Sequence, residues 1–122
     1  ELIKLLNSQG IPDDSIYIDT LVYPISTDDH SAVATIEAIG KIRNKYPQVH
    51  VICGLTNVSH GLPLRKLINR TFLVACMTRG LDAAILDPTD IELMSALLAA
   101  EALLGKDEFC MNFIKSYRGK RQ

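Results

Sequence analysis

Residues 54–65 read Gly54-Leu55-Thr56-Asn57-Val58-Ser59-His60-Gly61-Leu62-Pro63-Leu64-Arg65, and they directly follow a short apolar run, Val49 to Cys53. The apolar run has the length and continuous hydrophobicity of a strand that is covered on both faces, as in a parallel sheet. Small polar residues then form a loop, and Pro63 opens a pattern of helical period, with proline at its first position. Strand, polar loop and helix follow one another in this order where α/β proteins place ligands, at the carboxyl end of a parallel strand.

The same order of strand and helix recurs on both sides of this segment. Its alternation predicts an α/β fold with three parallel strands that alternate with helices, plus a C-terminal helix. Three strands cannot close a barrel, so we expect the free edge of the sheet to be covered in a homodimer or by rearrangement. The expected elements are helices over 1–10, 30–45, 63–79, 90–105 and 106–117, and strands over 16–19, 49–53 and 82–86.

Composition narrows the class of protein. The chain has 122 residues, a net charge of −1 and 48% hydrophobic residues, which fits a single segment with a real core. It lacks a basic cluster, a signal peptide and a membrane span, so we expect a cytoplasmic protein with no nucleic-acid or membrane partner. The three cysteines show no metal-ligand or redox spacing, so we expect no metal site, with Cys53 and Cys76 as core residues. Because Glu1 already lies within a helical pattern, we expect further residues before it.

Several motifs occur together along the chain. They are Ile16-Tyr17-Ile18-Asp19, Gly54-Leu-Thr-Asn57-Val-Ser59, Arg65, Leu67-Ile-Asn69-Arg70-Thr71-Phe72-Leu73 and Gly80-Leu-Asp82-Ala-Ala-Ile85-Leu-Asp87. Together they resemble the methyltetrahydrofolate:corrinoid (iron-sulfur) protein methyltransferases of the pterin-binding superfamily. Members of that family are (β/α)8 TIM barrels of roughly twice this length. The resemblance therefore implies that residues 1–122 form the C-terminal half of a pterin-binding barrel domain.

The resemblance also implies an activity. Enzymes of this family transfer the N5 methyl group between methyltetrahydrofolate and the cobalt of a corrinoid protein. Methyltetrahydrofolate or tetrahydrofolate is then the substrate, and a partner protein supplies the corrinoid (cobalamin). The enzyme needs no metal of its own for this reaction, and we expect the half-barrel to be inactive alone.

Two residues that end strands are implied to hold the pterin. In the resembling enzymes an aspartate after Tyr-Ile binds the pterin ring, and Asp19 stands at that position. A carboxylate accepts hydrogen bonds from the amino group and ring N–H of a pterin. By position alone, Asp19 also fits a turn or helix-cap residue. Asn57 matches the asparagine that approaches N5 in the family, which makes it the candidate catalytic residue as well as a pterin ligand.

Two further residues are weaker candidates. Arg65 lies in the first turn of its expected helix, facing the mouth of the site, and matches a family arginine close to the pterin. A solvated helix arginine is the alternative. His60 is the candidate that faces the corrinoid, but the family more often has glutamine there, and a loop histidine without a role fits equally. We interpret Asp87 as a turn and cap residue before a helix beginning near Asp90, and His50 as structural.

Three alternatives remain open. Dihydropteroate synthase is a relative in the same superfamily, but its serine-arginine-lysine cluster is replaced here by Thr56-Asn57-Val58-Ser59. The folate domain of cobalamin-dependent methionine synthase shares the asparagine motif but has a different flanking helix. An inactive barrel fragment that serves only assembly is the non-enzyme alternative, because other pterin ligands of the family lie on earlier strands.

Overall fold

The computed structural model describes residues 2–121, and its strands alternate with helices in the predicted order. The predicted three parallel strands and the C-terminal helix are confirmed. The elements are α1 (Leu2–Ser8), η1 (Asp13–Ser15), β1 (Tyr17–Asp19), α2 (Ser31–Lys45), β2 (His50–Gly54), η2 (Leu55–Ser59), α3 (Arg65–Thr78), β3 (Ala83–Ile85), α4 (Ile91–Leu103), η3 (Glu108–Cys110) and α5 (Met111–Arg121).

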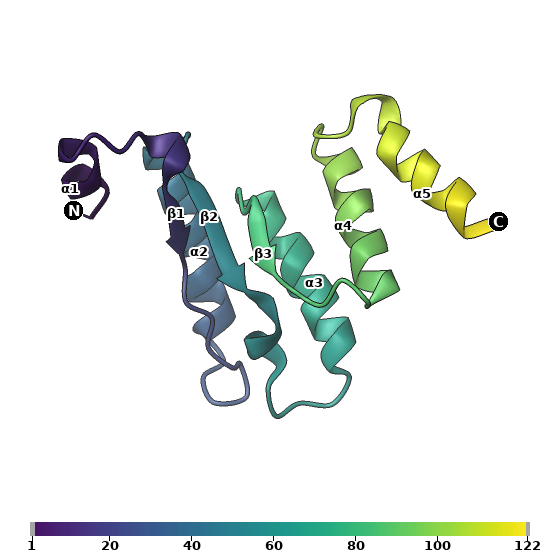
Figure 1. The fold of residues 1–122 in the computed structure, drawn as a ribbon. Helices are drawn as coiled ribbons and strands as arrows, with labels where there is room; N and C mark the ends of the chain where they lie inside the picture. The colour runs from purple at the N-terminus through teal and green to yellow at the C-terminus, as the bar shows by residue number, and fades with distance from the viewer. Residues whose placement is uncertain (1, 122) are drawn as a thin grey trace.

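The sheet has the order β1-β2-β3, with β2 hydrogen-bonded on both sides. Asp19 at the end of β1 is in register with Ile52, and Ile52 is in register with Ala83. The helices α2 and α3 lie on one side of the sheet, and α4 and α5 follow beyond β3 (Figure 1). The opposite face remains open, since Tyr17 is 60% exposed and Ile85 65% exposed. Three strands form an open sheet here, and both outer strands have a free edge among the described residues.

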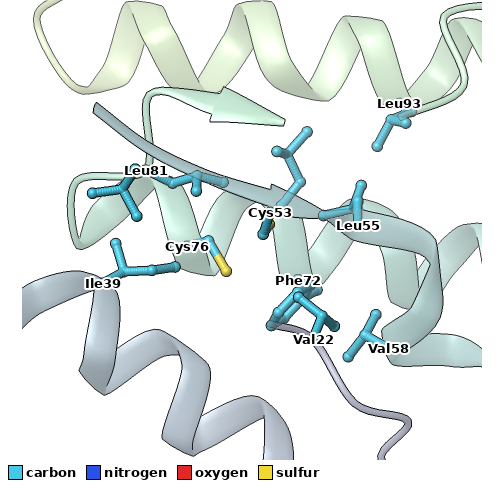
Figure 2. Close-up of a cluster of buried hydrophobic side chains, with 11 residues drawn as sticks. Val22, Ile39, Cys53, Leu55, Val58, Phe72, Cys76, Leu81 and Leu93 are labelled. Atoms are coloured by element: carbon cyan, nitrogen blue, oxygen red, sulfur yellow. The ribbon is translucent and has the colours of Figure 1, made fainter. Parts of the chain in front are cut away.

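The core lies between β2 and the helices α2 and α3 (Figure 2). Val51 and Cys53 alternate with half-buried residues along β2, so their fully buried side chains point to the same face. Cys53 meets Cys76 of α3 there, and both are core residues as predicted. The hydrogen bond with Cys53, together with burial, raises the pKa of the Cys76 thiol above its usual value. This thiol therefore stays protonated at neutral pH and serves packing.

Helix α3 begins two residues later than predicted. Pro63 is not the first helical residue, because Leu64 adopts a left-handed conformation (φ 56°) and redirects the chain before Arg65. The helical pattern after Pro63 predicts one apolar stripe that includes Leu64 and Leu67, and this is partly wrong because both side chains are exposed. The buried residues of α3 follow the spacing i, i+3, i+4, i+7 and are Asn69, Phe72, Leu73 and Cys76.

The end of the chain also departs from the prediction. The last helix begins at Met111 rather than near Lys106, because residues 106–110 form a turn that contains η3. The buried Asp107 carboxylate accepts hydrogen bonds from the backbone N–H groups of Asn112 and Phe113. It thereby satisfies two donors in the first turn of α5. Helix α4 begins next to Asp90, as predicted, and Asp90 is its N-cap because its carboxylate accepts from the backbone N–H of Leu93.

Polar contacts join the amino ends of β2 and β3. Nδ1 of His50 lies 2.7 Å from Asp82 Oδ2, and its Nε2 lies 3.0 Å from the carbonyl oxygen of Asp14. The His50 ring also stacks on Tyr17, with 4.4 Å between centroids. Arg43 of α2 reaches the same carboxylate at 3.4 Å. His50 is therefore a structural residue, as predicted. Within residues 2–121, no helix combines the length and the apolar character needed to cross a membrane.

The buried face of α3 gives a stability test. Leu73 is 1% exposed and Leu67 53% exposed on the same helix. Replacing a buried leucine with alanine removes contacts and leaves a cavity, so Leu73→Ala should lower the free energy of unfolding by about 2–5 kcal/mol. Leu67→Ala is the control and should change it by no more than about 0.5 kcal/mol. Urea unfolding measures both, and a larger loss for Leu67→Ala would contradict the placement of this helix.

Candidate functional site

Polar side chains gather at the carboxyl edge of the sheet. Asp19 is the last residue of β1, and its side chain is exposed. Among residues 2–121, no group hydrogen-bonds to its carboxylate or forms an ion pair with it. The chain after β1 stays attached to β2, because the N–H of Thr20 donates to the carbonyl oxygen of Ile52 at 3.1 Å. Asp19 therefore ends its strand next to β2 with its acceptor atoms open to a ligand.

Asn57 lies in η2, the short helical turn that follows β2 directly. Leu55 and Val58 of this turn are buried, which leaves Asn57 on its exposed side. The Nδ2 group of Asn57 donates to the carbonyl oxygen of Val22, three residues beyond Asp19. This bond connects η2 to the loop after β1 and fixes the plane of the amide. The oxygen Oδ1 and the second N–H of Nδ2 remain for a ligand.

The loop after β1 is held from two sides. From η2, the carbonyl oxygen of Val58 accepts from the N–H of Ile25 at 3.1 Å, and that of His60 accepts from the Ser26 hydroxyl at 2.8 Å. From α2, the hydroxyls of Ser31 and Thr35 donate to loop carbonyl oxygens at 3.0 and 3.3 Å. The loop between Asp19 and α2 is therefore part of a defined surface beside Asn57.

Arg65 is the first residue of α3, and its guanidinium turns back onto η2. Nε donates to the hydroxyl oxygen of Ser59 at 3.0 Å, and Nη2 donates to the carbonyl oxygen of Thr56 at 2.9 Å. The Ser59 hydroxyl donates in turn to Oδ1 of Asn69 at 2.7 Å. The sequence had indicated Arg65 as a ligand; the structure adds contacts that hold the turn carrying Asn57. Its role toward a pterin stays a prediction.

His60 and Asp87 lie at the same edge with different surroundings. The exposed His60 follows η2, and its backbone N–H donates to the carbonyl oxygen of Asn57 at 3.2 Å. Asp87 accepts from both the hydroxyl and the backbone N–H of Thr89, and these bonds lower the pKa of the Asp87 carboxyl below its usual value. Asp87 is thus a turn residue, as predicted. The role of His60 toward a corrinoid is a prediction that the described contacts leave open.

A hollow of about 700 Å³ lies beside Asp19 at the free edge of β1. Its walls come from β1, the loop that follows and α2, and they include Thr20, Tyr23 and His30. The Thr20 hydroxyl is buried and has no hydrogen-bond partner among the described residues. A second hollow of about 420 Å³ lies at the other free edge, between α3, β3 and α4. Sequence reasoning missed both hollows, because they depend on how the helices are placed around the sheet.

The described side chains were also considered as possible metal ligands. Within residues 2–121, no group of three or more histidine, cysteine or acidic side chains is placed to hold a metal ion. The site that the described residues form is instead one of carboxylate, amide and guanidinium groups. Such groups recognise a polar heterocycle by hydrogen bonds.

Comparison with known proteins gives this site a context. The chain is 38% identical over 122 residues to a methylcorrinoid:tetrahydrofolate methyltransferase of Eubacterium limosum, a match that covers 97% of this chain and 45% of that protein. It is also 38% identical over 88 residues to a methionine synthase of Mycobacterium tuberculosis, covering 67% of this chain and 7% of that protein. A methionine synthase of Mycobacterium leprae is 32% identical over 93 residues. No family model matches the sequence.

The fold places the chain among α/β proteins with a parallel sheet, the class in which ligands bind at the carboxyl ends of the strands. Within that class, the chain fits a segment of the family of methyltransferases named for methylcorrinoid and tetrahydrofolate, which confirms the resemblance stated from its motifs. It spans about half the length of the Eubacterium limosum relative and a small part of the methionine synthases.

The contacts of Arg65 predict a local change in stability. In Arg65→Ala the carbonyl oxygen of Thr56 and the hydroxyl of Ser59 each lose a charged donor, which loosens η2. The amides of His60 and Leu62, which donate to carbonyl oxygens of η2, should exchange with solvent about tenfold faster or more. Lys66→Ala, which changes the next residue of the same helix, is the control. Unchanged exchange in Arg65→Ala, measured by NMR, would show that the guanidinium does not support the turn.

Proposed function

We propose that this chain is part of a methyltransferase that moves a methyl group between a corrinoid and N5 of tetrahydrofolate. The observation that carries the proposal is the joint position of Asp19 and Asn57 at one edge of the sheet, where Asn57 is bonded to the loop that leaves Asp19. The name of the Eubacterium limosum relative, 38% identical over nearly the whole chain, supports the same reaction. The corrinoid is a substrate that a separate protein brings to the open mouth of the site.

Asp19 is the proposed ligand of the pterin ring. Its exposed carboxylate accepts hydrogen bonds only, and a pterin offers an amino group and a ring N–H on one edge. Both donors fit the two oxygens of one carboxylate, which gives a bidentate and directional contact. The chemistry of this side chain therefore fits a pterin, with the ring extending from β1 toward η2.

Asn57 is the proposed catalytic residue. The fixed Nδ2–Val22 bond leaves Oδ1 to accept a hydrogen bond from a protonated N5, while the second N–H can donate to an unprotonated one. A protonated N5 releases a methyl group far more readily than a neutral tertiary amine does, and in the opposite direction N5 loses its proton after attack. An amide has no useful acidity, so it acts as a preorganised dipole that favours the charged arrangement of the transition state.

The same proposal places this chain in a barrel. Both free edges of the sheet carry a hollow, and the buried Thr20 hydroxyl at one of them lacks a partner among the described residues. These features support further strands next to β1 and β3, as in a (β/α)8 pterin-binding barrel whose remaining strands supply further ligands. Coverage by a second copy of this chain is the alternative. If the chain served only assembly, neighbouring protein would still fill these hollows, but the protein would bind no pterin.

Methyltetrahydrofolate binding tests the proposed function. We expect the 122-residue polypeptide to bind weakly or not at all by calorimetric titration, and a version extended at its amino end to bind stoichiometrically. In the extended version Asp19→Asn should weaken binding, because one acceptor becomes a donor facing pterin donors. Asp29→Asn is the matched control, because Asp29 is an exposed acid in the loop between β1 and α2, and this variant should bind like the unchanged protein. Absence of binding by both polypeptides would overturn the proposal.

The rate of methyl transfer tests the role of Asn57. Asn57→Ala in the extended protein should lower kcat by about a hundredfold to a thousandfold, since a transition-state dipole is lost. The dissociation constant for methyltetrahydrofolate should change much less, because the ring remains held elsewhere. Asn44→Ala, an exposed asparagine on α2, is the control. A kcat for Asn57→Ala equal to that of the control would remove Asn57 from the mechanism.

A further inference from the structure

The short helical turn that carries the proposed catalytic residue also contains a buried serine. Ser59 is two residues after Asn57 in η2 and is 0% exposed, although serine is usually a surface residue. Its hydroxyl donates to Oδ1 of Asn69 at 2.7 Å and accepts from Nε of Arg65 at 3.0 Å. The same hydroxyl also lies 3.1 Å from the carbonyl oxygen of Thr56 in its own turn. Its bonds to Asn69 and Arg65 are the ones that connect η2 to α3.

These bonds tie η2 to the helix that follows it. Asn69 occupies a buried position of α3, between residues that face the core, so it is a rigid anchor. Arg65 contacts the turn at a second point, because its Nη2 donates to the carbonyl oxygen of Thr56, the residue before Asn57. Side chains of α3 therefore hold the turn at Thr56 and at Ser59, which stand on either side of Asn57 in the sequence.

The backbone before α3 supports the same interpretation. Leu64 is exposed, adopts a left-handed conformation and receives no packing in return. Such a conformation costs energy in a branched residue and persists where its surroundings require it. Here it places Arg65 at the first position of α3, from which the guanidinium reaches Ser59 and Thr56.

We propose that Ser59, held between Asn69 and Arg65, is a positioning residue that sets the amide of Asn57 against N5 of the substrate. The inference rests on the proposed function, since it assigns to Ser59 an effect exerted through Asn57. Ser59 itself is buried below the turn and does not touch the substrate. A displacement of the amide by even about 1 Å lowers the rate of a reaction that depends on its direction.

The experiment measures single-turnover methyl transfer by the full-length enzyme. Ser59→Ala should lower the rate by about tenfold to a hundredfold with little change in the dissociation constant for methyltetrahydrofolate. Asn69→Leu should have the same effect, whereas Asn69→Asp keeps an oxygen acceptor for the Ser59 hydroxyl beside Arg65 and should restore most of the rate. Ser8→Ala removes a serine hydroxyl in α1 that bonds only to the backbone of its own helix. It is the control and should transfer methyl groups at the unchanged rate.

The double variant separates positioning from general support of the fold. If Ser59 acts through Asn57, Ser59→Ala should lower the rate no further once Asn57 is already alanine. The rates of methyl transfer of the double variant and of the Asn57→Ala single variant should then agree within about twofold. A further tenfold loss in the double variant would overturn the inference while leaving the proposed function intact. An unaffected Asn57→Ala single variant would remove Asn57 from the mechanism and overturn this inference with it, whereas absence of methyltetrahydrofolate binding would overturn the proposed function itself.

Discussion

The parallel pairing of β2 with strands on both sides is the constraint on which the rest of the structure depends. Because Val51 and Cys53 are fully buried on the helix-covered face, the register of β2 is determined by the core. Parallel pairing then brings the ends of all three strands to one edge. Asp19, η2 and the turn at Asp87 lie together for that reason, although they are far apart in sequence. The site is thus a consequence of packing on the other face of the sheet.

The edge itself is organised by hydrogen bonds to backbone carbonyl groups. Asn57 donates to Val22, Ser26 to His60, and Arg65 to Thr56. Each bond satisfies a carbonyl oxygen that regular secondary structure leaves without a partner, and each joins two segments of the edge. Loops that follow strands are usually more variable than the elements they connect. Here the loop after β1 and the turn after β2 support each other through hydrogen bonds, so the carboxyl edge of the sheet is a defined surface.

The match to methyltransferases can be set beside these local features. The chain corresponds to about half the length of a relative named for methylcorrinoid and tetrahydrofolate. Among residues 2–121 the sheet has two free edges, and a hollow lies beside each of them. At the amino end of the sheet, His50 hydrogen-bonds to Asp82 and stacks on Tyr17, and Arg43 forms an ion pair with the same carboxylate. The carboxyl end carries the exposed acceptor atoms of Asp19, and parallel α/β folds place their sites at that end.

The sequence by itself determined the order of strands and helices, the parallel sheet and the residues at its carboxyl edge, because apolar period and strand-end polar residues are local signals. The motif from Gly54 to Arg65 was sufficient to indicate Asn57 as the central residue. It could not show that α3 begins after a left-handed Leu64, or that Arg65 turns back onto Ser59. Only the tertiary structure decided the direction of the Asn57 amide, the burial of Ser59 and the faces of α3, since each depends on contacts between segments that local patterns do not encode.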